Sequence, residues 1–312
     1  MSPALTLHFA HRPSALAYMA SALLPSPGLG PGRRVPALRA RWTGHLAQPR
    51  EVAELLRLTG LPVTEYLPPL YFHVFTFPLQ MALLTHRAFP HPIWRALQVR
   101  SHLLQHRPVP VEAVCDFETR VAGQRVLDKG AEADLHTVVH WQGARVWEGL
   151  TTFYYRGRFG APEPASTLAR APHPGSERVA SWQGLGRGSW AFGRFSGDFN
   201  GIHFWSPYAR LFGFRGAFHH PQVMLGQALA HLPQPDRSGA WRLDAWLKGP
   251  LYYGTEVSLR ASPERDGTVF ALFAEGEQRP AILGRWSACA AEARLIDERG
   301  DAEGACPEQS EG

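Results

Sequence analysis

The chain has 312 residues, of which 45% are hydrophobic and 19% are charged. This length predicts about two domains, and the composition excludes a chain that is mostly disordered. With 10 Trp, 17 Phe, 27 Pro and 30 Gly, the sequence favours a β-rich or α+β protein with many turns over a helical bundle.

The formal net charge is +5 and the sequence pI is near 9.4. A mild positive field suits anionic ligands such as nucleotide phosphates or an acidic carrier protein, but it equally describes an ordinary solvated surface. The arginines are dispersed and form no recognised binding motif, so we expect no nucleic-acid partner. Cys115, Cys289 and Cys306 form no C-x-x-C pair, which argues against a disulfide framework or a zinc site and predicts a reducing, cytoplasmic compartment.

No uninterrupted apolar run reaches membrane-spanning length, so we expect no membrane span. No Asp or Glu precedes Glu51, while arginines are frequent there. This bias is similar to that of an organelle transit peptide, but we favour an ordinary basic first segment. Within it, residues 13–24 are expected to form a helix.

The first half of the chain runs to residue 159. Residues 75–87 are apolar and can form a helix, and three strand-like runs follow at 111–121, 131–141 and 144–156. Gln142-Gly143 is a tight-turn signal between the last two. Residues 160–177 are rich in Pro, Ala, Ser and Gly and are expected to form a linker.

The second half covers residues 178–296. Residues 182–195 are strand-like, and residues 221–232 predict a helix that is apolar on most faces and therefore buried. Four further strands are expected, at 240–248, 255–261, 268–274 and 281–288. The tail 297–312 is acidic and poor in apolar residues, which predicts disorder.

Both halves thus read as a helix followed by strands, and this order predicts an α+β architecture in which each helix packs on an antiparallel sheet. A sheet wrapped around a buried helix is the hotdog arrangement. We therefore expect a first hotdog-like domain at 1–159 without a catalytic motif and a second at 178–296 that contains one.

The segment from Phe195 to His203 carries the chemistry. Asp198 and His203 lie five residues apart across a turn with a glycine on either side of Asn200, so both side chains could face one small site. A carboxylate and an imidazole that share one water can supply the base and the acid needed to add water to an activated alkene. Taken singly, Asp198 could be a turn or capping residue and His203 a packed core residue.

The residues around this pair extend the motif. The run Ser196-Gly197-Asp198-Phe199-Asn200-Gly201-Ile202-His203, followed by Ala209, Gly213-Phe214 and His220, resembles the hydratase-2 or MaoC-like dehydratase family. The resemblance implies a double hotdog whose halves pair as a pseudo-dimer. It implies reversible hydration of a trans-2-enoyl thioester to the (3R)-3-hydroxyacyl thioester, carried on CoA or acyl carrier protein. It implies no metal or redox cofactor, and it leaves a homodimer open. Residues 248–254 look like the family's first strand after the helix.

By the same resemblance, Asp198 and His203 act jointly and Asn200 orients them. The substrate-binding and oxyanion-binding positions would be His220, Pro221, Gln222, Val223, Gly213 and Phe214. Two residues depart from the family pattern. Gly201 replaces a proline, and Pro221, which has no N–H, replaces a glycine whose amide helps to bind the thioester oxygen. The next amides, those of Gln222 and Val223, or the side chains of Gln222 or His219, could take over at the positive end of the helix.

The first half has no Asp-x-Asn-x-x-His arrangement; Phe77-Pro78-Leu79 and His86 occupy the corresponding region. By resemblance to double-hotdog proteins, this half would have lost its own site and would instead widen the groove for the acyl chain. Two other functions stay open: a catalytically impaired thioester-binding or partner protein, favoured by Pro221, and a hotdog thioesterase.

Overall fold

The computed structural model describes residues 5–28, 34–184, 188–234 and 239–296. The first half contains β1 (Leu5–Phe9), α1 (Ala15–Ala22), β2 (Leu38–Leu46), α2 (Pro49–Thr59), α3 (Tyr71–Phe75), α4 (Phe77–Leu84), η1 (Ile93–Arg95), β3 (Ala96–Gln105), β4 (Val114–Leu127), β5 (Gly130–Trp141) and β6 (Ala144–Arg156). The second half contains η2 (Thr167–Ala169), β7 (Glu177–Gln183), α5 (Ser189–Ser196), η4 (Gly201–His203), α6 (Ser206–Leu211), α7 (Pro221–Ala230), β8 (Ala240–Leu247), β9 (Glu256–Glu264), β10 (Gly267–Ala274) and β11 (Ile282–Cys289).

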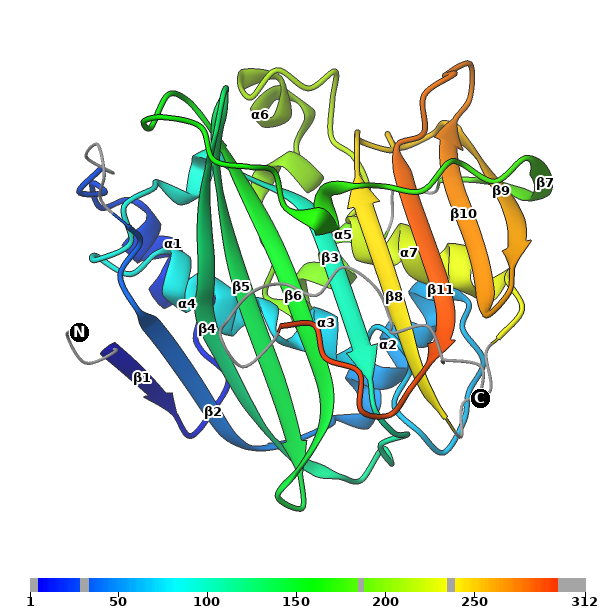
Figure 1. The fold of residues 1–312 in the computed structure, drawn as a ribbon, viewed down its shortest axis with the longest axis horizontal. Coiled ribbons are helices and arrows are strands. Elements are labelled where there is room, and N and C mark those ends of the chain that lie inside the picture. The colour runs from blue at the N-terminus through cyan, green and yellow to red at the C-terminus, as the bar shows by residue number, and fades with distance from the viewer. Residues whose placement is uncertain (1–4, 29–33, 185–187, 235–238, 297–312) are drawn as a thin grey trace.

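The strands form one continuous sheet in the order β1-β2-β4-β5-β6-β3-β8-β11-β10-β9-β7. All neighbours are antiparallel except β1 and β2. The two halves meet where β3 pairs with β8, in a register from Arg100↔Trp246 to Gln105↔Trp241. Each half therefore contributes its own set of strands, and backbone hydrogen bonds at one central junction join the halves (Figure 1).

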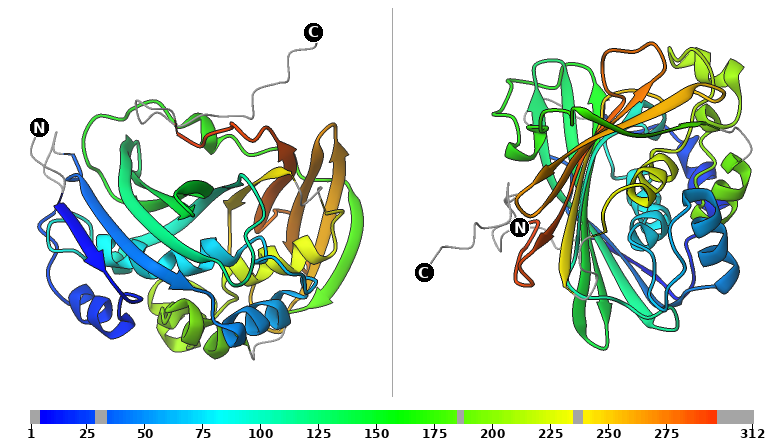
Figure 2. Two further views of the ribbon diagram at one scale, coloured as in Figure 1. Left: turned by 90° about the horizontal axis from the view of Figure 1, so that it is seen from below. Right: turned by 90° about the vertical axis from the view of Figure 1, so that its right-hand side faces the viewer.

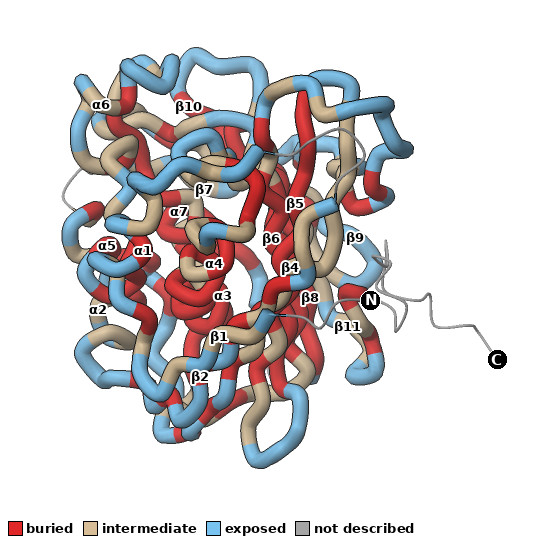
Figure 3. Tube along the Cα trace, turned by 90° about the vertical axis from the view of Figure 1, so that its left-hand side faces the viewer, coloured by how far each residue is buried: buried red, intermediate tan, exposed pale blue. Residues whose placement is uncertain are grey.

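The sheet curves around three short helices, α3 and α4 from the first half and α7 from the second (Figure 2). These helices are buried on most faces (Figure 3), as expected for elements that are apolar all round. Their side chains belong to one apolar core with the inward-facing residues of both sets of strands. The double-hotdog architecture predicted from the sequence is confirmed.

The opposite face of the sheet is also covered. The segment after β6 and the segment after β11 both cross it (Figure 1). Leu168 and Leu295 pack there against Leu104 and Leu150, and the indole N–H of Trp246 donates to the carbonyl of Leu168 at 2.8 Å. Because the central strands are covered on both faces, β5 and β6 are buried along most of their length.

Two expected elements are wrong. The strand predicted at 182–195 ends at Gln183, and Ser189–Ser196 is helix α5 instead. Glycines 184, 186 and 188 interrupt the strand pattern, since glycine is unfavourable in a strand interior. Residues 248–254 form a loop after β8. Within this loop, Tyr252 makes an isolated β-bridge to Phe218, and neither residue belongs to a strand. Pro250 has no N–H for a ladder, and Gly254 has φ +76°.

The other predicted helices and strands are present, with ends that shift by a few residues. The sequence reading did not identify α2, β2 or β3. The predicted disordered tail, 297–312, lies outside the described residues. Within the described ranges, no helix combines the length and the apolarity that a membrane crossing requires.

Candidate active site

Helix α5 delivers Asp198 to the interior. The helix ends at Gly197, which is left-handed at φ 82°, a conformation that glycine adopts without strain. The chain then turns inward, so the Asp198 side chain is buried. The Asp198 N–H donates to Ser196 Oγ at 3.1 Å, and Asp198 Oδ1 accepts from the Asn200 N–H at 3.1 Å. Asp198 Oδ1 thus makes the local turn contact that the sequence allowed for this aspartate, while Oδ2 lies on the side of His220.

His203 lies at the end of the short helix η4. Asn200 caps this helix, because its Oδ1 accepts from the Ile202 N–H at 3.3 Å. The His203 Nδ1 lies 3.0 Å from the carbonyl oxygen of Phe218. A carbonyl only accepts, so Nδ1 carries the proton, and Nε2 of the neutral ring keeps its lone pair. Asn200 itself is exposed, and it orients His203 through the backbone of η4.

Gly201, which replaces the proline expected at this place, packs closely against the ring of Tyr208. A Cβ at this position would lie 2.7 Å from Cδ1 of the Tyr208 ring, closer than real contacts allow. The ring of Tyr208 therefore takes the space that a side chain at 201 would need. Together with the Asn200 cap, this packing fixes the turn that the glycine would otherwise loosen.

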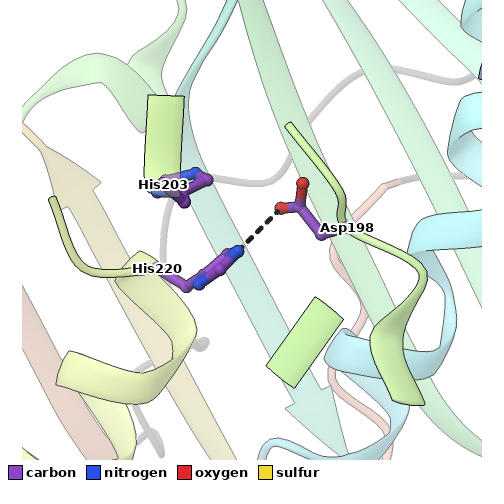
Figure 4. A group of neighbouring side chains, drawn as sticks. All are labelled: Asp198, His203 and His220. Atoms are coloured by element: carbon purple, nitrogen blue, oxygen red, sulfur yellow. Dashed lines mark ion pairs between the residues drawn. The ribbon is translucent and has the colours of Figure 1, made fainter. Parts of the chain in front are cut away.

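His220 joins the pair from the N-cap position of α7 (Figure 4). Its ring stacks on that of His203 with centroids 4.0 Å apart, and its Nε2 lies 3.8 Å from Asp198 Oδ2. One ligand atom from each of the three residues lies within 4.8 Å of the others. The three ligand atoms are close enough together to contact one small species, and the ring planes of the two histidines are 28° apart.

Burial shifts the acid–base properties of all three groups. It raises the pKa of Asp198 against the opposing effects of His203 and the Asn200 N–H. Burial lowers the pKa of His203, although the Asp198 carboxylate pulls it upward, and it lowers the pKa of His220 well below its usual range. Near neutral pH both imidazoles are thus neutral, and the carboxyl is a better proton carrier than an exposed aspartate.

A cavity of about 560 Å³ opens beside these groups, between the two halves of the molecule. Asp198, His203, Tyr208 and Lys248 bring polar atoms to its wall. The first half contributes a mostly apolar wall. Its members come from α1, α4, η1, β3 and β6, and include Met19, Leu23, Phe77, Met81, Ile93, Trp94, Leu97 and Phe153.

The predicted site residues divide into two groups. Those that line the cavity are Asp198, Asn200, His203, Phe214, Pro221 and Gln222. His220, Gly213 and Val223 do not line it: the His220 ring stacks on that of His203, and exposed Gly213 follows the C-cap residue of α6. The expectation of a free Val223 amide is wrong, because this N–H donates to the His220 carbonyl at 3.1 Å, an i to i−3 bond at the start of the helix.

The cavity-wall residues that sequence reasoning missed include Tyr18, Gln98 and Lys248. Tyr18 of α1 donates a hydrogen bond to the Gly197 carbonyl, and its pKa is raised by burial and by Asp198. Gln98 belongs to β3 of the first half, and Lys248 follows β8. Tyr18 is 179 residues from its partner, and no local pattern marks such a contact.

Comparison with known proteins agrees with this geometry. No family model matches the chain. The sequence is 28% identical over 188 residues to 3-hydroxyacyl-thioester dehydratase X of Mycobacterium tuberculosis, a match that spans 59% of this chain and 66% of the relative. The crystal structure of HtdX from that organism superposes with a TM-score of 0.68 at 22% identity, covering 80% of this chain and 99% of HtdX.

A MaoC-like dehydratase from Phytophthora capsici superposes with a TM-score of 0.65 at 18% identity, covering 82% of this chain and 97% of the other. At these identities the structural matches show a shared fold. The sequence match independently shows common ancestry over more than half of the chain. The chain therefore has the double-hotdog fold that these dehydratases share, and it is similar in sequence to a 3-hydroxyacyl-thioester dehydratase.

Proposed function

We propose that the protein catalyses the reversible hydration of trans-2-enoyl thioesters to (3R)-3-hydroxyacyl thioesters. The observation that carries this proposal is the pair Asp198 and His203, buried side by side in the wall of a cavity that is otherwise largely apolar. The name of the relative in Mycobacterium tuberculosis, 3-hydroxyacyl-thioester dehydratase X, describes the reverse direction of the same reaction.

The pKa shifts of Asp198 and His203, together with the proton on His203 Nδ1, support the following mechanism. In the hydration direction, the lone pair on His203 Nε2 takes a proton from water while the water oxygen bonds to C3 of the enoyl group. The C2–C3 π electrons move toward the thioester, whose oxygen gains negative charge. Asp198 acts in its protonated form, which its raised pKa favours: the carboxyl gives its proton to C2, and a proton passing from His203 to Asp198 resets the site. Because the two groups are coupled, we assign these tasks to the pair.

The shape and lining of the cavity suggest how a thioester would lie. Asp198 and His203 mark the place of the reacting carbons, and the apolar wall from the first half would receive the acyl chain. We propose CoA or acyl carrier protein as the carrier. Lys248, an exposed residue of the cavity lining, provides a cation on the side of the second half, where it could face a phosphate of the carrier.

The test is an assay of 2-enoyl-CoA thioesters with wild-type protein, Asp198→Asn and His203→Ala. We expect wild type to form the (3R)-3-hydroxy product without releasing free thiol, and each variant to lose about two to four powers of ten in kcat. Equal activity in all three proteins would refute the role of the pair. Free thiol in place of the hydroxy product would instead indicate a thioesterase, and binding without turnover would indicate an acyl-thioester-binding protein.

A further inference from the structure

Gln222 presents an unused polar group to the cavity. It is the second residue of α7, directly after Pro221, and its side chain is only 6% exposed. It lines the same cavity as Asp198 and His203. Among the described residues, its Oε1 has no hydrogen-bond partner. Leaving a buried polar atom unpaired destabilises a fold, because the atom loses its water without gaining a partner. This end of the Gln222 amide is therefore positioned for a ligand rather than for the fold.

The other end of the Gln222 amide is held by a chain of two residues from β3. Gln222 Nε2 lies 3.4 Å from Gln98 Oε1, and Gln98 Nε2 lies 2.7 Å from Ser101 Oγ. Ser101 is buried, and the register of β3 shifts just after Gln98. This irregularity lets Gln98 line the cavity while it also contacts Ser101. The first half of the molecule thus sets the orientation of a side chain in the second.

This chain of contacts is satisfied equally well with both amides reversed. The oxygen and nitrogen of a glutamine amide have nearly the same shape, and a serine hydroxyl can donate or accept. In the reversed arrangement, the Ser101 hydroxyl donates to Gln98 Oε1 and Gln98 Nε2 donates to Gln222 Oε1. The Gln222 Nε2 then takes the place facing the cavity, where it is an N–H donor.

The proposed hydration needs a donor at this place. Pro221 has no N–H, and the amides of Val223 and Met224 donate to the His220 carbonyl at 3.1 and 3.3 Å, so the donors left at the start of the helix are those of Gln222, its backbone N–H and its side-chain amide. The thioester oxygen gains negative charge during the reaction, and an acceptor facing it would be repelled. We propose that the Gln222 side-chain amide is the donor that stabilises this oxygen, and that Gln98 and Ser101 hold it in the donating orientation. This inference rests on the proposed function.

The proposal is tested by rescue. Kinetics of 2-enoyl-CoA hydration are measured for wild type, Gln222→Met, Pro221→Gly and the Pro221→Gly/Gln222→Met double variant. We expect Gln222→Met to lower kcat about a hundredfold with little change in KM, because the lost donor acts in the transition state. The Pro221→Gly substitution supplies a backbone N–H at the adjacent position, so the double variant should regain most of the lost kcat.

Two further variants separate chemistry from folding. Gln227→Met is the matched control on the same helix: its side chain bonds Trp182 and Leu58 outside the cavity, so kcat should stay at the wild-type value. Gln98→Met, which removes the positioning contact, should lower kcat about tenfold in the wild-type background, the effect of losing roughly one neutral hydrogen bond. In the Gln222→Met background it should have no effect.

The outcomes are distinct. If wild type does not hydrate the substrate, the proposed function fails and this inference fails with it. If wild type is active and Gln222→Met keeps its kcat, only this inference is overturned. It is also overturned if Gln222→Met loses activity but Pro221→Gly does not restore it, because the loss would then be structural.

Discussion

The two halves of the molecule wrap the sheet around a short helix with a proline in its first turn, yet they use the place before that helix differently. Before α7, the chain forms the loop that carries Asp198 and His203 to a cavity. Before α4, it forms α3, whose Tyr71 and Phe75 stack 4.3 Å apart in the core. The same architecture thus supports a reaction site in one half and aromatic packing in the other.

The buried histidines show this difference most clearly. His203 has one nitrogen bonded to the Phe218 carbonyl and lies in the wall of the cavity. His73 of α3 is just as buried, but neither of its ring nitrogens has a hydrogen-bond partner among the described residues, and it does not line the cavity. Burial therefore lowers the pKa of both groups, while only His203 can meet a substrate. Burial by itself does not make a histidine functional; a second group and an accessible cavity are needed.

The largest expected effect is the loss of kcat when Asp198 and His203 are replaced. Because Asp198 and His203 act as a unit, the double variant Asp198→Asn/His203→Ala should lose no more kcat than the worse single variant, about two to four powers of ten. His73→Leu, the matched change in the first half, should keep the wild-type kcat. Fully additive losses in the double variant would contradict a shared mechanism.

The pH dependence of kcat/KM tests the role of His203 as the base. His203 must be neutral to take a proton, and burial places its pKa below the usual 6.5. We therefore expect kcat/KM to fall on the acid side below about pH 6.5, as the pair takes up a further proton, and on the alkaline side as Asp198 loses the proton that it donates. In His203→Ala this acid limb should disappear from the residual rate. An acid limb centred well above pH 6.5 in wild type would show that a group other than His203 acts as the base.

The next effect concerns stability and belongs to the first half. Burial lowers the pKa of His73 to about 4, whereas in the unfolded chain it is about 6.5. Between these values the unfolded state binds more protons, so the free energy of unfolding rises with pH and is lost as the pH falls from 6.5 to 4. The loss for this one group is about 3 kcal/mol at pH 4.

Denaturant unfolding of wild type and His73→Leu between pH 4 and 7 measures this effect. Removing the imidazole should reduce the loss of stability on acidification by about 3 kcal/mol. Replacing the exposed His231 with leucine is the control, and this variant should follow the wild-type pH dependence. An unchanged slope in His73→Leu would mean that the ring becomes solvated or paired in solution.

Much of this arrangement follows from local sequence patterns, and the remainder from contacts between distant segments. The spacing of Asp198, Asn200 and His203 predicted a joint site. The side chains of Asp198 and His203 lie close together with that of His220, and all three predicted residues line the cavity. The strand reading of 182–195 was wrong because aromatic residues such as Trp190 and Phe192 favour strands in isolation, while the packing of α5 decides the outcome. Tyr18 and Gln98 could not be predicted, since their partners lie 179 and 124 residues away along the chain.

The smallest expected effect is a change in chain-length preference, and it tests whether the first half forms the wall for the acyl chain. Met81 of α4 lies in the apolar part of the cavity, opposite in character to the polar groups of the second half. The Met81→Trp substitution would fill space there. Burying one methylene of the acyl chain contributes about 0.8 kcal/mol. Excluding two methylenes should therefore lower kcat/KM roughly tenfold. We expect this loss for long-chain enoyl-CoA substrates, while a four-carbon substrate keeps the wild-type rate. If both substrates lose equally, the acyl chain does not lie along α4, and the first half serves only to complete the sheet.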